Sequence, residues 1–158
     1  MHLAQLNIGL PIAPVTEPEL AGFVAGLESV NAEADAAPGF VWRLQTEDGD
    51  ATAVRAFGDD RLLVNMSVWT SIEALGDYVY NGLHRAIMVR RREWFVPMRE
   101  AFQVLWWVPE GHFPTVAEAE DRLAHLREHG PTPYAFTFRR PFDGDVAAAA
   151  TGDWMCGV

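Results

Sequence analysis

Amide, indole, imidazole and guanidinium side chains are spaced along this chain so that several of them could reach one ligand. The first apolar segment, QLNIGL at residues 5–10, contains Asn7, and a later segment, VNMSVWTS, contains Asn65 and Trp69. Asn65 and Trp69 are four residues apart, so a β-strand would place them on the same face. In a dry site such donors could stabilise a substrate that reacts as an anion, although a buried amide pair and a packed indole would fit the pattern equally well.

His84 is the histidine whose neighbours suit chemistry best. Ile87, Met88 and Arg91 follow it at i+3, i+4 and i+7, so a helix would give it apolar neighbours and a cation. Three interpretations are open. His84 could be a core or interface side chain, a ligand of haem iron with Arg91 near a propionate, or a general acid/base or substrate contact.

Other aromatic side chains and one more histidine are candidates for substrate contact. Flat aromatic walls suit a flat ligand, yet at least half of such residues should simply fill the core. The candidates are Trp42, Trp94, Trp106, Trp107 and His112. His112 could instead order the turn before a helix. No spacing resembles HExxH, CxxC or a carboxylate-rich cage, so we expect no dedicated metal site.

Hydrophobic periodicity and helix-capping patterns predict the elements that carry these residues. Capping-box patterns begin at Thr16, Thr70 and Thr115. We expect strands at 3–8, 40–46, 62–69, 104–108 and 134–138, and helices at 17–35, from 72 to about Gly82, over 84–96, and from 116 to Gly130. The acidic segment 47–60 is predicted to be a hairpin connection whose backbone is extended around residues 52–57.

The element order β-α-β-β-α-β-α-β predicts an α+β fold. Its first six elements match the ferredoxin-like split βαβ plan, with helices covering one face of an antiparallel sheet. The third strand is apolar on both faces, with Val64 and Met66 on one and Leu63 and Trp69 on the other. We therefore expect a second copy to cover the outer face in a homodimer. Residues 1–138 would form one domain, followed by a C-terminal tail over 139–158.

Composition restricts the possible partners. Acidic residues outnumber basic ones by 22 to 12, giving a formal charge of −10, which argues against binding nucleic acid or an anionic membrane. Arg90, Arg91 and Arg92 form a local basic spot that could meet a small anion or face solvent. We find no signal-peptide pattern and no run long enough to span a membrane. The lone cysteine, Cys156, cannot form an internal disulfide, so a cytoplasmic protein is expected.

Three stretches carry a resemblance to a known family: NAEADAAPGFVWRLQ, SVWTSIEALGDYVYNGLHRAIMVRRREWF and LWWVPEGHFPTVAEAEDRLAHLREHGPTPYAFTF. Over about residues 1–138 the chain resembles a bacterial domain-of-unknown-function family of the dimeric α/β-barrel superfamily. That superfamily includes antibiotic-biosynthesis and haem-degrading monooxygenases, chlorite dismutases, aldoxime dehydratases and lactone isomerases. The resemblance implies a dimeric α/β barrel with a pocket between sheet and helices, and it does not fix one reaction.

Two patterns within the superfamily imply different chemistry. Asn65 and Trp69 are similar to the asparagine and tryptophan of cofactor-free, quinone-forming monooxygenases. Small haem-degrading monooxygenases have an asparagine on the first strand, a tryptophan at the end of the third strand and a histidine that binds the haem iron. The residues similar to these are Asn7, Trp69 and His84, so this resemblance implies that His84 is an iron ligand. We favour the first pattern, which implies a cofactor-independent oxidoreductase that acts on an aromatic or polyketide-like substrate. The substrate would be positioned by Asn7, Asn65 and Trp69, and its proton or negative charge would be handled by His84 and Arg91. A haem protein and a non-catalytic ligand-binding dimer are the alternatives.

Overall fold

β1 is the central strand of a five-stranded antiparallel sheet in the computed structural model, which describes residues 1–45 and 57–148. The strands are β1 (His2–Pro11), β2 (Phe40–Arg43), β3 (Leu63–Trp69), β4 (Phe95–Val96) and β5 (Gln103–Val108). The helices are α1 (Ala21–Ala36), which follows a 3-10 turn at Pro18–Leu20, α2 (Ile72–Val79), α3 (Gly82–Val89), α4 (Arg91–Trp94) and α5 (Val116–His129).

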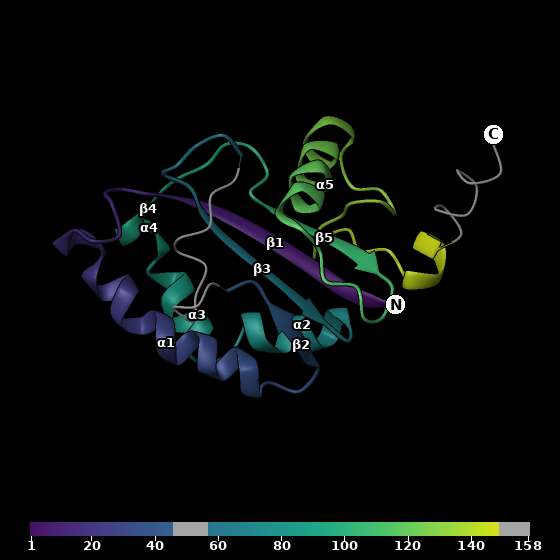
Figure 1. Cartoon of the computed structure of the whole chain (residues 1–158), viewed down its shortest axis with the longest axis horizontal. Helices are drawn as coiled ribbons and strands as arrows, with labels where there is room; N and C mark the ends of the chain where they lie inside the picture. Colours follow the sequence, from purple (N-terminus) through teal and green to yellow (C-terminus); the bar gives the residue numbers. More distant parts are fainter. Residues whose placement is uncertain (46–56, 149–158) are drawn as a thin grey trace.

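The strand order confirms the ferredoxin-like plan. β1 pairs with β3 on one side and with β5 on the other, β2 pairs with the outer edge of β3, and short β4 pairs with the end of β1 (Figure 1). In the β1–β3 ladder Leu3 lies opposite Trp69, Asn7 opposite Asn65 and Gly9 opposite Leu63. The helix predicted over 84–96 is wrong at its end, where β4 forms instead, because a two-residue strand has no periodicity to detect.

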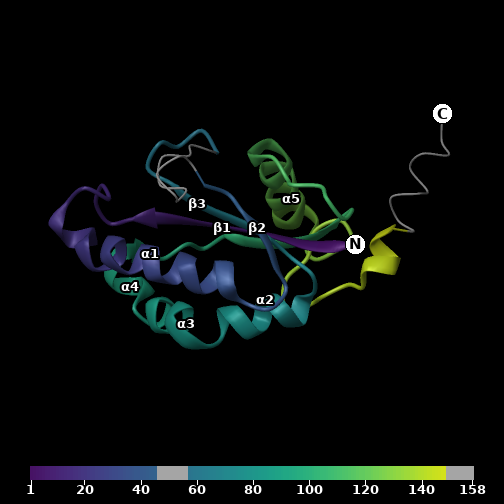
Figure 2. The same cartoon turned by 60° about the horizontal axis from the view of Figure 1, so that its bottom comes forward.

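The two faces of the sheet pack against different helices. Side chains alternate along a strand, so Ala4, Leu6 and Ile8 of β1 share one face. They form a core with residues of α5, namely Ala119, Leu123 and Leu126. Leu3 and Trp69 lie on the other face, where they pack with residues of α1 and α2. Figure 2 shows α1–α4 below the sheet and α5 above it.

The expectation that all helices cover one face is therefore wrong for α5. The apolar residues Val64 and Met66, which suggested a partner subunit on the outer face, are buried with α5 of the same chain. The homodimer stays a prediction, which light scattering would test. Within the described residues no helix is both long and apolar enough to cross a membrane.

Two of the three predicted helix caps form, one of them a residue later than expected. Thr115 Oγ1 accepts a hydrogen bond from the backbone N–H of Glu118 at 3.1 Å. At α2 the capping residue is Ser71 rather than Thr70, and its hydroxyl accepts from Ala74 N at 3.1 Å. The pattern at Thr16 precedes a 3-10 turn that no side chain caps.

The predicted strand at 134–138 does not form. Only Phe136 bridges to the sheet, through Leu105. Local turns use its neighbours instead: Thr132 and Ala135 bond each other, and the Tyr134 carbonyl accepts from Arg122 Nη1 at 2.7 Å. The tail is anchored where described, since Trp107 Nε1 donates to Phe142 O and residues 144–148 are helical. The extended segment predicted at 52–57 falls largely, and Cys156 wholly, outside the described residues.

Gly39 joins α1 to β2 in a conformation that excludes larger residues. Its φ is +83°, and an added Cβ would lie 2.5 Å from the Cβ of Ala74. We expect Gly39→Ala to lower the free energy of unfolding by about 1–3 kcal/mol more than Gly111→Ala in urea titrations. Gly111 is the matched control, because its φ is +84° and its Cβ would meet no atom within 4 Å. Equal losses in the two variants would contradict the packing argument.

Candidate functional site

A cavity of about 380 Å³ lies between the sheet and helices α1–α4. Its floor is the face of the sheet that carries Gln5 and Asn7 of β1, which we call the cavity face. The polar side chains that line it, the tryptophans aside, are Gln5, Asn7, Asn31, Arg43, Asn65, Ser67, Tyr78, Tyr80, His84, Arg91 and Gln103. The volume lies within the usual range for small-molecule sites.

Two rows of polar side chains cross the cavity face. Asn7 lies opposite Asn65 on β3 and Gln103 on β5, so three strands each contribute an amide to one row. In the next row Gln5 lies opposite Ser67. The alternation of strand side chains thus places these amides and the hydroxyl on the cavity face, where Gln5 and Ser67 are buried and Asn65 is exposed.

Hydrogen bonds connect the second row to Asn65 of the first row and to Trp69. Gln5 Nε2 donates to Asn65 Oδ1 at 2.7 Å and to Ser67 Oγ at 3.0 Å, and Trp69 Nε1 donates to the same Ser67 oxygen at 2.9 Å. The Trp69 N–H is therefore not available to a ligand, contrary to the sequence-based role as a donor. The side chain of Asn7 and the amino group of Asn65 make no hydrogen bond within the described residues, so they remain available to a ligand.

Aromatic rings form one end of the cavity. Trp69 stacks on Tyr78, with ring centroids 5.1 Å apart, and meets the edge of Phe40 at 5.4 Å. The Tyr78 hydroxyl donates to Val30 O at 3.1 Å, and burial raises the pKa of this phenol, so it stays protonated. The indole and phenol rings offer a flat surface rather than an acid or a base.

His84 lies on this aromatic end, with its ring centroid 4.9 Å from that of Tyr78. Its Nδ1 lies 2.9 Å from the carbonyl oxygen of Val79. A carbonyl only accepts, so Nδ1 carries the proton, and in the neutral ring Nε2 carries the lone pair. Burial lowers the pKa of His84 below its ordinary value, which keeps the ring neutral at pH 7. His84 can therefore accept a proton or bind a metal through Nε2.

Glu33 of α1 fixes the start of the helix that carries His84. Its Oε2 accepts from the backbone N–H of Leu83 at 3.0 Å. Gly82 makes this contact possible, because its φ is +58° and an added Cβ would lie 2.1 Å from Glu33 Oε1. The glycine that suggested a helix break in the sequence thus separates α2 from α3 and receives the carboxylate.

Arg91 places a positive charge beside the far end of β1. Its Nη2 donates to Ile8 O at 3.2 Å, and the guanidinium lies over the rings of Phe95 and Phe102, at 5.0 and 4.7 Å from their centroids. Burial lowers the pKa of Arg91, but a guanidinium still stays charged. Among the described residues no carboxylate forms an ion pair with Arg91.

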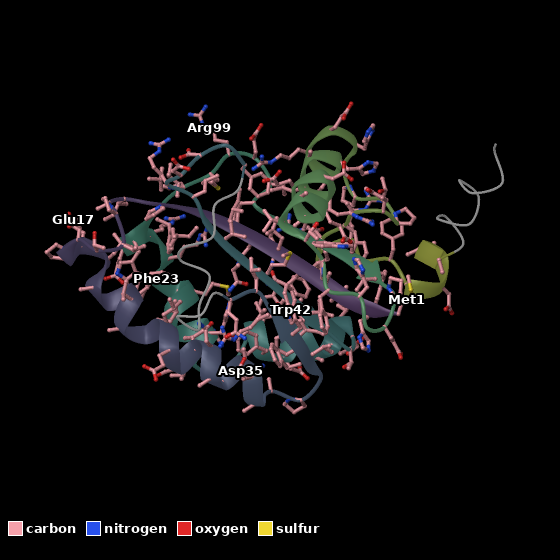
Figure 3. The ribbon with its side chains drawn as sticks, in the orientation of Figure 1. Met1, Glu17, Phe23, Asp35, Trp42 and Arg99 are labelled. Atoms are coloured by element: carbon pink, nitrogen blue, oxygen red, sulfur yellow. The ribbon has the colours of Figure 1, made fainter. Side chains whose placement is uncertain are left out.

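The structure gathers six of the ten predicted site residues at the cavity. They are Asn7, Asn65, Trp69, His84, Arg91 and Trp94. Trp94 is 3% exposed and packs against Phe23 near the start of α1, labelled in Figure 3. Their roles remain predictions, but their common location follows from the sheet register and from the helices above it.

The other four predicted contacts lie elsewhere. A β-bulge between Phe40 and Trp42 shifts the register of β2, so Phe40 faces Trp69 while Trp42 turns to the α5 side and stacks on Phe113 at 5.4 Å. Trp106 is also on the α5 side and donates to Glu118, which binds His112 as well. Trp107 lies beyond the cavity, against the segment that contains Phe142.

Sequence reasoning missed seven polar residues of the cavity: Gln5, Asn31, Arg43, Ser67, Tyr78, Tyr80 and Gln103. Gln5 and Ser67 carry a readable signal, since they share the odd-numbered positions of Asn7 and Asn65 on neighbouring strands. Tyr78 and Gln103 carry none, because a tyrosine in an amphipathic helix and a glutamine at a strand start are ordinary surface patterns.

The α+β fold, with its ferredoxin-like antiparallel sheet, is similar to that of several solved structures. A conserved protein from Methanosarcina mazei Go1 has 11% identity and a TM-score of 0.51, with 69% of this chain and 94% of that chain covered. A Nitrosomonas europaea protein, assigned by name to the antibiotic biosynthesis monooxygenases, has 11% identity and a TM-score of 0.50, covering 71% and 94%. SnoaB, a cofactor-independent oxygenase from Streptomyces nogalater, has 16% identity and a TM-score of 0.48, covering 69% and 94%.

The likeness to the Methanosarcina and Nitrosomonas structures shows a shared fold and no shared activity, because each is only 11% identical to this chain. The chain itself belongs to the family described as domain of unknown function DUF3291, whose model matches residues 2–151. This confirms the resemblance seen in the sequence. No curated protein matches the chain.

Ser67 is the acceptor on which the network of the cavity face depends. In Ser67→Ala the buried N–H of Trp69 loses its partner, so we expect the free energy of unfolding to fall by about 1–3 kcal/mol in urea titrations. Asn65→Ala is the control, because Gln5 keeps Ser67 as an acceptor and Asn65 is exposed. A loss in Asn65→Ala as large as in Ser67→Ala would argue against this role.

The buried, neutral state of His84 has a pH signature. Its ordinary pKa is 6.5 and the folded value is lower, so the unfolded chain binds a proton that the folded chain does not. Stability should therefore fall as pH decreases through 6.5 and below, and His84→Gln should remove that part of the slope. NMR titration of the imidazole resonance lost in His84→Gln measures the pKa directly. A value at or above 6.5 would contradict the assignment.

Proposed function

We propose that the protein is a cofactor-independent oxygenase for a small aromatic or polyketide-like substrate. The observation that carries the proposal is the state of His84. Its Nδ1 proton is held by Val79 O, burial keeps the ring neutral, and Nε2 is left to act as a base beside the cavity. The fold is also that of proteins named as antibiotic biosynthesis monooxygenases, which supports oxygenation as the reaction.

The reaction begins with proton transfer from an acidic C–H or O–H group of the substrate to His84 Nε2. The resulting aromatic anion is an electron donor to O₂. For a substrate with an activated CH₂ group, O₂ adds to the carbanion carbon to form a peroxide anion, which takes the proton back from His84 to become a hydroperoxide. Loss of water then leaves a carbonyl, so one oxygen atom stays in the product, the other leaves as water, and the substrate supplies all the electrons.

Other cavity residues hold the substrate and favour its anion. Asn7 and the amino group of Asn65 can donate hydrogen bonds to oxygens on the ring system, because neither is used within the described residues. The stacked rings of Trp69 and Tyr78 offer a flat wall. The charge of Arg91 lies in the same cavity and lowers the energy of any anion formed there.

Oxygen uptake tests the proposal. With anthrone and a panel of hydroquinones as substrates, we expect oxygen consumption that falls at least about a hundredfold in His84→Ala, the scale of losing a general base. His129→Ala is the matched control, since His129 ends α5 on the opposite side of the sheet. Tight ligand binding without oxygen uptake would instead indicate a non-catalytic ligand-binding protein.

Haem is the second candidate, supported by the same histidine. A metal-binding histidine typically donates its other N–H to a carbonyl, as His84 does to Val79, and Arg91 could pair with a propionate. Bound haem would supply iron for oxygen chemistry, while His84 would serve as its ligand rather than as a base. Titration with haemin separates the two candidates: a Soret shift in the wild type that disappears in His84→Ala selects haem, and no uptake excludes it.

A further inference from the structure

The charge of the cavity is opposite to that of the protein. The chain carries a formal charge of −10, yet none of the described residues that line the cavity is an aspartate or a glutamate. Two arginines, Arg43 and Arg91, do line it. A cavity with cations and no lining carboxylate attracts anions, even on an acidic protein, because the local potential decides binding.

The two arginines differ in how far their charge is compensated. Arg43 forms a two-pronged ion pair with Asp35 of α1, with Nε–Oδ1 at 2.7 Å and Nη2–Oδ2 at 3.2 Å (Asp35 is labelled in Figure 3). Arg91 forms no ion pair with any described carboxylate, and its one hydrogen bond within the described residues goes to the neutral carbonyl of Ile8. Arg91 is therefore the uncompensated cation of the cavity.

Arg91 is also held in place before a ligand arrives. The Ile8 carbonyl and the rings of Phe95 and Phe102 restrain its guanidinium. A guanidinium has five N–H donors in a fixed plane, so one bond to Ile8 leaves donors for a planar, two-oxygen anion. Restraint before binding reduces the entropy lost on binding, which favours recognition of that group.

We propose that Arg91 is the anchor for a carboxylate at one end of an elongated aromatic ligand. The inference rests on the proposed function in that it names the substrate class of the same cavity. Trp69 lies opposite Leu3, whereas Arg91 bonds Ile8, five residues further along β1. At about 3.3 Å per residue the two points are roughly 17 Å apart along the strand. The amide rows lie between them, so the carboxylate is bound at the end remote from the aromatic wall.

The test compares two ligands of the same ring and shape, the anion anthracene-2-carboxylate and the neutral anthracene-2-carboxamide, by isothermal titration calorimetry at low salt. We expect the wild type to bind the carboxylate about ten- to a hundredfold more tightly, the range for hydrogen bonds to a charged group. In Arg91→Met this preference should disappear, while binding of the amide stays within about twofold. Arg91→Lys should keep part of the preference, since it retains the charge without the planar donors.

Arg92→Met is the matched control, because it removes the same charge from the neighbouring, exposed position. It should leave the preference unchanged. Equal binding of the two ligands by the wild type, no binding of either, or a preference that survives in Arg91→Met would each overturn the proposal. Equal binding of the two ligands and no binding of either are both measured on the wild type, so these two outcomes do not depend on whether a variant folds.

The carboxylate preference can be measured independently of the proposed oxygenation, because neither ligand has an activated CH₂ group or a hydroquinone that could be oxidised. A carboxylate preference without oxygen uptake by anthrone or the hydroquinones would leave the anchor intact and refute the oxygenase. Oxygen uptake without a carboxylate preference would do the reverse.

Discussion

The pairing of β1 with β3 is the constraint on which the rest of this structure depends. Its register sets Leu3 against Trp69, Gln5 against Ser67 and Asn7 against Asn65. A slip of one residue would exchange the two faces, burying the amides against α5 and turning Leu6 and Ile8 toward the cavity. The apolar contacts with α5 and the hydrogen bonds around Ser67 therefore stabilise the same register from opposite faces of the sheet.

Much of this arrangement can be predicted from the sequence, because the alternation of side chains between the two faces of a strand depends only on neighbouring residues. Asn65 and Trp69, four residues apart, do share a face, and Asn7 lies on that face across the ladder. The same parity would have found Gln5 and Ser67. The order of the elements likewise predicts the sheet topology, since a split βαβ chain has few ways to pair its strands without crossing connections.

What the sequence leaves undetermined depends on contacts between distant segments. A single bulge turned Trp42 to the α5 side, and no residue near it signals where the extra residue falls. α5 is amphipathic and could have packed on either face, so its position on the outer face was not predictable from its pattern. The spacing around His84 suggested reactivity, but which nitrogen is free follows from the Val79 carbonyl, which only the folded chain brings near.

The proposed function requires that His84 Nε2 removes a proton from a ligand held on the cavity face. Hydrogen exchange measures this step without oxygen: anthrone is incubated anaerobically with the protein in D₂O, and deuterium at its CH₂ carbon is followed by NMR. We expect exchange well above the buffer rate with the wild type and at the buffer rate with His84→Gln, which removes the base while keeping a neutral side chain. Exchange at the buffer rate with the wild type, or equally fast exchange with His84→Gln, would contradict it.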